Sequence, residues 1–186
     1  MFGAKEDLLE LPAHRFPDVL SPLQYPAMSE HLHTYKDTSP WKMITAMSRS
    51  FFEIRPIDFA HISFQSSDDK PFRAWFTVSP EFRDRMDKAD GEMVVIMMSD
   101  HIVTTSAFIT LIQKGYESIM EQSASLSHIV HFHEVENIDP LGWFLYESTC
   151  DKQASARYII DARIYDQRGR CILSSVQEGL VQKKAK

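Results

Sequence analysis

The stretch DHIVTTSAFITLIQKGYESIME, residues Asp100–Glu121, decides the fold of this chain. Its apolar side chains recur at helical spacing and together cover most of the circumference of a helix. Only a thin stripe around Thr104, Thr105 and Thr110 is polar. Asp100 is a candidate N-cap, because its carboxylate can accept hydrogen bonds from the free amides of a first helical turn. The pattern therefore predicts one long helix that is buried nearly all round.

The segments on both sides of this helix are typical of strands. Phe72–Val78 alternates apolar and polar residues, as a half-buried strand does. Met93–Met98 is apolar on both faces, which favours a central strand covered on each side. Asp166–Gly169 has the composition of a hairpin turn. The predicted strands are Phe51–Arg55, Phe72–Val78, Met93–Met98, Leu126–His133, Trp143–Thr149, Ser155–Tyr165 and Cys171–Val181. We expect an α+β domain in which a mostly antiparallel sheet wraps around a single buried helix.

The front of the chain has a different character. Residues 1–49 are rich in proline and follow neither strand nor helix periodicity, and proline removes backbone donors and disfavours helix before it. We predict that residues 1–49 form an arm or linker, with a short helical turn near Trp41–Met47. The arm either packs against the domain or once joined it to another. Residues 50–183 are the predicted domain.

The composition excludes several classes of protein. The length of 186 residues suits one domain, and a net charge of -6 argues against a nucleic-acid partner. The basic cluster Lys183, Lys184 and Lys186 is a solvated tail. Cys150 and Cys171 are too few for a disulfide framework and fit a reducing compartment. No charged-then-apolar leader and no apolar run near ~18 residues is apparent, so we expect an intracellular protein without a membrane span. Its location is cytoplasmic or peroxisomal, although the C-terminus is no clear peroxisomal signal.

Three polar residues stand at the ends of apolar elements: Asp100, Ser125 and Gln177. A carboxylate, a hydroxyl and an amide are together able to hold one water molecule. The set indicates a hydrolase that has no serine or cysteine nucleophile. Taken singly, each residue has an ordinary role, as a helix cap, a strand-entry hydroxyl and a strand-end amide.

The three histidines His128, His131 and His133 raise the question of a metal site. On a strand, His131 and His133 share a face while His128 points to the other, and no further ligand follows at zinc spacing. We therefore expect neither a metal nor a cofactor.

Several motifs, in order and at matching spacing, resemble the second half of an acyl-CoA thioesterase II protein, a family with two hot-dog domains in one chain. They are Phe52-Glu53-Ile54-Arg55-Pro56-Ile57-Asp58, Ser99-Asp100, Ser127-His128-Ile129-Val130-His131-Phe132-His133, Trp143-Phe144-Leu145-Tyr146-Glu147-Ser148, Ala154-Ser155-Ala156-Arg157 and Ser175-Val176-Gln177-Glu178-Gly179-Leu180. The resemblance implies a hot-dog fold, in which the sheet wraps around the helix. It also implies hydrolysis of a fatty acyl-CoA to a free fatty acid and CoA.

The resemblance assigns the water-binding residues by position. The family's Asp, Thr and Gln fall on Asp100, Ser125 and Gln177, and serine keeps the hydroxyl of threonine. The chain departs from the family at Ser127, where the family has Asp, and at Glu134, where an arginine is usual. We expect the charge reversal at Glu134 to weaken the attraction for an anionic ligand. The first hot-dog domain has no counterpart in the chain.

Two functions follow from the resemblance. The first is an active thioesterase that forms a homodimer, or a heterodimer with a two-domain relative, through the edge of its sheet. In it, helix N-terminal amides would meet the developing oxyanion, and Lys152, Arg157 and Arg163 are candidates for the CoA phosphates. The second is a non-catalytic module that binds acyl-CoA or a two-domain partner.

Overall fold

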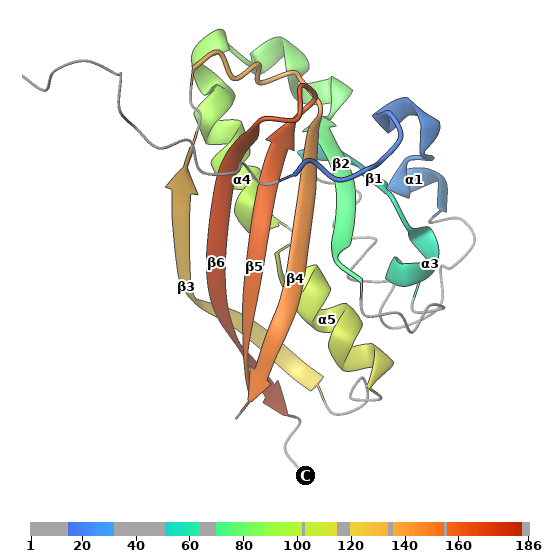
Figure 1. The fold of residues 1–186 in the computed structure, drawn as a ribbon, viewed down its shortest axis with the longest axis vertical. Coiled ribbons are helices and arrows are strands. Elements are labelled where there is room, and N and C mark those ends of the chain that lie inside the picture. Colours follow the sequence, from blue (N-terminus) through green and yellow to red (C-terminus); the bar gives the residue numbers. More distant parts are fainter. Residues whose placement is uncertain are drawn as a thin grey trace, which may run out of the picture.

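A computed structural model gives the structure of residues 15–31, 51–63, 70–101, 103–114, 120–133, 136–154 and 156–183. Six strands form one antiparallel sheet in the order β1-β2-β4-β5-β6-β3, so β1 and β3 are its edges (Figure 1). The strands are β1 (Phe52–Pro56), β2 (Phe72–Val78), β3 (Met120–Phe132), β4 (Phe144–Ala154), β5 (Arg157–Asp166) and β6 (Cys171–Lys183). The helices are α1 (Met28–His31), α3 (Phe59–Ile62), α4 (Gly91–His101) and α5 (Thr104–Gln113), with 3-10 turns η1 (Pro22–Gln24), η3 (Pro80–Arg85) and η4 (Lys88–Asp90).

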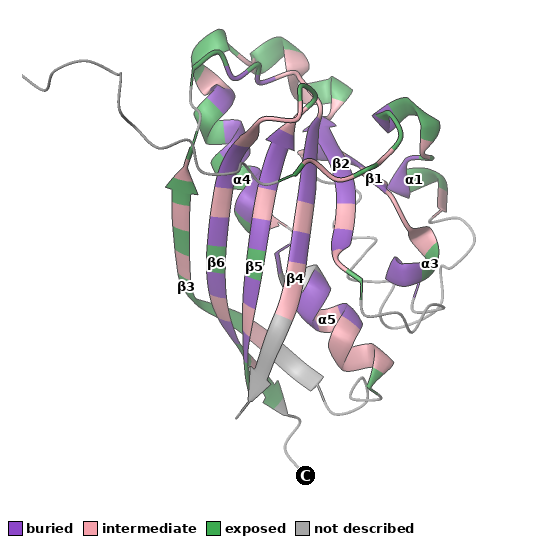
Figure 2. Ribbon diagram, viewed as in Figure 1, coloured by how far each residue is buried: buried purple, intermediate pink, exposed green. Residues whose placement is uncertain are grey.

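The helices α4 and α5 cover one face of the sheet, which we call the inner face (Figure 1). The strands bury alternate residues, as the banding in Figure 2 shows. In β5 the buried residues Tyr158, Ile160, Ala162 and Ile164 point to this face and alternate with exposed or half-buried ones. The predicted class, an α+β domain with an antiparallel sheet wrapped on a helical core, is confirmed.

The prediction of a strand at Met93–Met98 is wrong, because these residues lie within α4. Val94, Val95 and Met98 are buried at helical spacing against the sheet, while Met93 and Met97 are exposed. A short apolar run has no period that separates strand from helix, and the need to cover the inner face decides the outcome here.

The helix predicted for Asp100–Glu121 is also displaced. Asp100 lies in the last turn of α4 and is therefore not an N-cap, and α5 starts at Thr104 and ends at Gln113. Met120, which the prediction placed in the helix, begins β3. Because α4 precedes Asp100, the positive end of that helix lies at Gly91, and the helix N-terminus nearest to Asp100 in the sequence is that of α5, at Thr104.

The helical stretch Lys88–Gln113 is long and apolar enough to span a membrane, judged by length and composition alone. Its most apolar window has a mean hydropathy of 1.6, and 47% of that window is buried within the protein. A helix that packs against the inner face of a sheet has this same composition, so the measure carries little weight for a membrane span.

Part of the proline-rich arm packs against the outer face of the sheet, opposite the helices (Figure 1). The ring of Phe16 meets the ring of Tyr165 edge-on, with 5.6 Å between the ring centroids. The centroid of Phe16 lies 6.3 Å from that of the Trp75 ring. The indole Nε1 of Trp75 donates a hydrogen bond to the Leu20 carbonyl at 3.1 Å. Phe16, Val19 and Tyr25 of the arm therefore add a second apolar layer to the sheet. The predicted turn at Trp41–Met47 lies outside the described residues.

The predicted hairpin turn between β5 and β6 is confirmed. The Asp166 carboxylate accepts hydrogen bonds from the amides of Arg168 at 3.0 Å and Arg170 at 2.9 Å. Gly169 has a φ of 81°, a left-handed conformation that glycine adopts without strain. This turn fixes the register in which β6 runs back along β5.

We expect Phe16→Ala to lower the free energy of unfolding by about 1–2 kcal/mol, because it removes a half-buried ring from Trp75 and Tyr165. Leu23→Ala is the matched control in the same arm, since Leu23 is 73% exposed. Chemical denaturation followed by tryptophan fluorescence measures both. Equal effects of the two substitutions would mean that the arm does not stabilise the domain.

Candidate active site

The structure brings Asp100, Ser125 and Gln177 together from three different elements. Gln177 lies on β6 and is fully buried, whereas Asp100 on α4 and Ser125 on β3 are exposed. The Gln177 amide nitrogen Nε2 donates to Asp100 Oδ1 at 3.0 Å and to Ser125 Oγ at 2.5 Å. We call these three residues the polar cluster.

The chemistry of the polar cluster fixes the orientation of the Gln177 amide. A carboxylate only accepts hydrogen bonds, so the NH₂ group, and not the carbonyl, must face Asp100. Both amide hydrogens are then used, one by Asp100 and one by Ser125. The Oε1 atom is buried and has no hydrogen-bond partner within the part of the chain that the structure describes. The cluster therefore retains an acceptor at Gln177 and a hydroxyl proton at Ser125.

A β-bulge in the edge strand places Ser125 in the cluster. Ser125 pairs with Gly179 and Ser127 with Glu178, which leaves Leu126 as the extra residue. Without the bulge, Ser125 and His128, three residues apart, would lie on opposite faces of β3. With it, Ser125 joins the inner-face residues of β3 and faces Gln177.

Gly179 in the Gln-Glu-Gly segment makes room for a tyrosine. Tyr158 is its partner on β5, and a Cβ on Gly179 would lie 2.1 Å from the Tyr158 ring. The Tyr158 hydroxyl hydrogen-bonds with Ser123 Oγ at 2.8 Å, two residues before Ser125. Tyr158 therefore crosses β6 and braces the part of β3 that carries Ser125. Sequence reasoning missed this contact.

Two histidines flank the polar cluster. His128 on β3 lies with its Nε2 3.3 Å from the Ser99 hydroxyl on α4. Burial lowers the pKa of His101, and the neighbouring carboxylate of Asp100 opposes that shift.

The surface beside Asp100 is apolar, since Met93, Ile96 and Met97 are exposed on the same side of α4 at helical spacing. The cluster is thus closed below by the sheet and open towards this surface.

The other residues suggested by the sequence do not meet at the polar cluster. Arg157 and Arg163 alternate with the inner-face residues of β5 and so lie on the outer face, where Arg157 pairs with Glu178 at 2.7 Å. The position of the Lys152 side chain and that of Glu134 lie outside what the structure describes. Within the described residues, no group of three His, Cys, Asp or Glu side chains could hold a metal ion.

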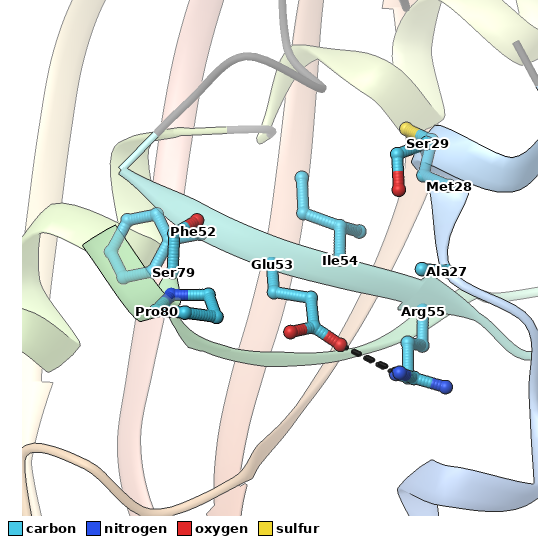
Figure 3. Close-up of a pocket in the computed structure, with 9 residues that line it drawn as sticks. All are labelled: Ala27, Met28, Ser29, Phe52, Glu53, Ile54, Arg55, Ser79 and Pro80. Atoms are coloured by element: carbon cyan, nitrogen blue, oxygen red, sulfur yellow. Dashed lines mark hydrogen bonds and ion pairs between the residues drawn. The ribbon is translucent and has the colours of Figure 1, made fainter. Parts of the chain in front are cut away.

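A cavity of about 310 Å³ lies at the opposite edge of the sheet, between α1 and β1 (Figure 3). Its charged residues, Glu53 and Arg55, form an ion pair at 2.8 Å. The polar cluster is beside β3 at the other edge, so this cavity is a separate feature.

The fold is that of a hot-dog domain. Its polar cluster joins Asp100 on α4 to Ser125 on β3 and Gln177 on β6. The sequence matches the model of the acyl-CoA thioesterase C-terminal domain over residues 22–181. The chain therefore belongs to this family, and the hot-dog fold predicted from its motifs is confirmed. No curated protein sequence matches the chain.

Solved structures agree on the fold. An acyl-CoA thioesterase II, TesB2, from Mycobacterium marinum is 18% identical with a TM-score of 0.64, and the match covers 98% of this chain and 60% of that one. The TesB protein of Mycobacterium avium subsp. paratuberculosis is 19% identical with a TM-score of 0.61, covering 94% and 56%. A hot-dog protein of unknown function from Alicyclobacillus acidocaldarius is 14% identical with a TM-score of 0.64, covering 100% and 60%. The chain thus spans about 60% of the length of such structures.

We expect Gly179→Ala to destabilise the protein by about 1–3 kcal/mol, because the added Cβ forces the Tyr158 ring to move. Tyr158→Phe is the control, since it removes only the hydroxyl that meets Ser123 and leaves the ring over Gly179. Equilibrium denaturation compares the two variants. A Gly179→Ala protein as stable as the native one would show that Tyr158 can relax without cost.

Proposed function

We propose that this chain is the hydrolytic domain of an acyl-CoA thioesterase, which converts a fatty acyl-CoA to a free fatty acid and CoA. The observation that carries the proposal is the buried Gln177 amide, which holds Asp100 and Ser125 side by side. A pure structural role would not need a carboxylate and a hydroxyl gathered at the open side of one buried amide. Membership of the thioesterase family supports the same function.

The polar cluster has the groups needed to orient one water molecule. Among the described residues, no other hydrogen bond reaches the Asp100 carboxylate. A water on the open side of the cluster that donates one hydrogen to Asp100 keeps a lone pair for attack, while Gln177 Nε2 holds that carboxylate in place. The Ser125 hydroxyl steadies the same water. Fixing a nucleophile in this way lowers the entropic cost of reaching the transition state.

The proposed reaction needs no covalent enzyme intermediate. The water oxygen bonds to the thioester carbonyl carbon as Asp100 accepts its proton. The carbon–sulfur bond then breaks, and the CoA thiolate leaves with the proton that Asp100 returns. The products are the free carboxylic acid and the CoA thiol.

We expect Asp100→Asn to lower kcat by roughly 10²–10⁴-fold, because an amide cannot accept the proton. The fold should survive, since Asp100 is exposed and the Asn oxygen still accepts the hydrogen bond from Gln177. Ser125→Ala and Gln177→Ala should cost less, since each leaves the base in place. Thiol release from short-, medium- and long-chain acyl-CoAs measures all three variants. Full activity of Asp100→Asn would contradict the water-activation mechanism.

A second function, binding without turnover, also has support. Asp100 and Ser125 are open to solvent, so the polar cluster is not enclosed by the described residues. A domain of this kind would bind acyl-CoA or a two-domain partner. The same thiol-release assay separates the functions, since a binding module gives saturable acyl-CoA binding and no free thiol.

We further propose that a second copy of this chain covers the open side of the polar cluster. The exposed α4 residues Met93, Ile96 and Met97 form an apolar stripe in line with Asp100, and Leu126 is exposed on the edge strand β3. An unpaired strand edge next to an apolar surface favours association. Pairing of β3 with its own copy would extend the sheet and enclose the cluster. A two-domain relative is the alternative partner.

We expect light scattering at micromolar concentration to give about twice the mass of 21.5 kDa for the native chain. Met97→Lys should give the monomer mass, because it places a charge within the apolar stripe. Leu23→Lys is the control at an exposed position of the arm. A native protein that is already monomeric would contradict self-association and favour a different partner chain.

A further inference from the structure

The last turn of α4 has a second hydrogen bond to the sheet, beside the polar cluster. The His128 Nε2 atom on β3 lies 3.3 Å from the Ser99 hydroxyl oxygen, and Ser99 is fully buried, with 0% exposure. Ser99 directly precedes Asp100, whose carboxylate accepts a hydrogen bond from Gln177 at 3.0 Å. Two successive residues of α4 are therefore each bonded to the sheet.

The two sheet residues that make these bonds are neighbours. His128 on β3 pairs with Gln177 on β6, and the side chains of such a cross-strand pair point to the same face of the sheet. The Cβ atoms of a cross-strand pair are about 5 Å apart. The bonds to Ser99 and Asp100 thus come from adjacent points on the inner face.

Two bonds to successive residues restrict a helix more than one bond does. The buried side chains of Val94, Val95 and Met98 hold α4 against the sheet, but apolar contact is not directional. Successive residues point about 100° apart around a helix axis. A helix bonded at Asp100 alone can still turn about that contact, whereas a second bond at Ser99 fixes its rotation. The place of the Asp100 carboxylate therefore depends on both bonds.

The hydrogen bonds of Ser99 determine which nitrogen of His128 carries a proton. The Ser99 hydroxyl donates its one hydrogen to the Ile96 carbonyl at 2.8 Å. The Ser99 oxygen can then only accept, so His128 Nε2 is the donor and carries a hydrogen, an assignment that follows from the hydrogen-bond network. An amide N–H at this position would make the same bond. Glutamine is therefore the conservative replacement for His128.

We propose that His128 is a positioning residue, which holds the Asp100 carboxylate in place through its hydrogen bond to Ser99. This inference rests on the proposed thioesterase function, in which Asp100 is the base. In this role His128 does not contact the reacting atoms. A displacement of about 1 Å at the reacting centre can cost on the order of 10²-fold in rate. A hydrogen bond one residue before the base is therefore sufficient to affect the reaction.

Steady-state kinetics of thiol release from acyl-CoAs test the inference. We expect His128→Ala to lower kcat by roughly 10–100-fold with little change in KM, because it displaces the base and leaves the substrate contacts. His128→Gln should keep most of the native kcat, since its amide can donate to Ser99. Ser99→Ala should lower kcat as His128→Ala does, and the double variant should lower it no further. His131→Ala is the matched control, because His131 is exposed on the outer face of the same strand.

The side-chain amide of Gln177 gives a readout that needs no activity. Nuclear magnetic resonance of protein with isotope-labelled glutamine detects its two amide protons, and Gln177→Ala identifies them by their loss. We expect His128→Ala and Ser99→Ala to shift these signals and to speed their exchange with solvent, because the hydrogen bond to Asp100 loosens. His128→Gln and His131→Ala should leave them as in the native protein.

The two measurements separate this inference from the proposed function. Amide signals that change as expected, in a protein that releases no thiol, support the positioning of Asp100 while the hydrolytic function fails. Equal kcat of the native and His128→Ala proteins would overturn the inference and leave the hydrolytic function standing. Gln177 signals that neither His128→Ala nor Ser99→Ala alters would overturn it as well. Thermal melting shows which variants are folded, and Ser99→Ala, a change to a good helix former, decides the outcome if His128→Ala is unfolded.

Discussion

The buried amide of Gln177 connects the three elements on which the candidate site depends. Its two hydrogens reach Asp100 on α4 and Ser125 on β3, while its own strand, β6, lies inside the sheet. Burying an amide is unfavourable unless its hydrogen bonds are made. Moving α4 along the sheet, or shifting β3 by one residue, would leave an N–H group unpaired beneath the helix. The bulge at Leu126 meets this constraint, because it turns Ser125 towards the inner face.

The side chains of strand β6 alternate between the two faces of the sheet, and those on the inner face serve both the core and the polar cluster. Its inner-face residues Ser175, Gln177 and Gly179 supply a hydroxyl, the bridging amide and the space for Tyr158. Its outer-face residues Val176 and Glu178 are exposed or half-buried. Three successive inner-face positions of β6 therefore contribute to the core, to the polar cluster and to the bracing of the edge strand. Polar side chains on the inner face contribute less apolar burial than aliphatic ones would. Apolar contacts with the helices on the inner face and with the arm on the outer face stabilise the sheet.

Local patterns predicted much of this fold. The alternation of Phe72–Val78 matches β2, and the turn residues after Asp166 place the last hairpin. Asp100, Ser125 and Gln177 follow from the resemblance to the family. The prediction that each ends an apolar element is wrong for Ser125 and Gln177, which lie within β3 and β6. The prediction of a strand at Met93–Met98 is wrong, because a helix and a strand can bury such an apolar run equally well. The bulge at Leu126 and the Tyr158–Gly179 contact depend on the register between distant strands, for which a single sequence has no local signal.

The charges of the described residues bear on how the domain would bind a CoA thioester under the proposed function. The chain has a net charge of -6, and four of the described arginines are paired with carboxylates, namely Arg55, Arg73, Arg157 and Arg170. Arg157 and Arg163, on the outer face, are separated from the polar cluster by the sheet itself. Attraction between these arginines and the phosphates of CoA is therefore weak at the cluster. Under the proposed function, burial of the acyl chain would supply affinity that these arginines do not. The acyl group, rather than the nucleotide, would then be the part of the substrate that the described residues distinguish.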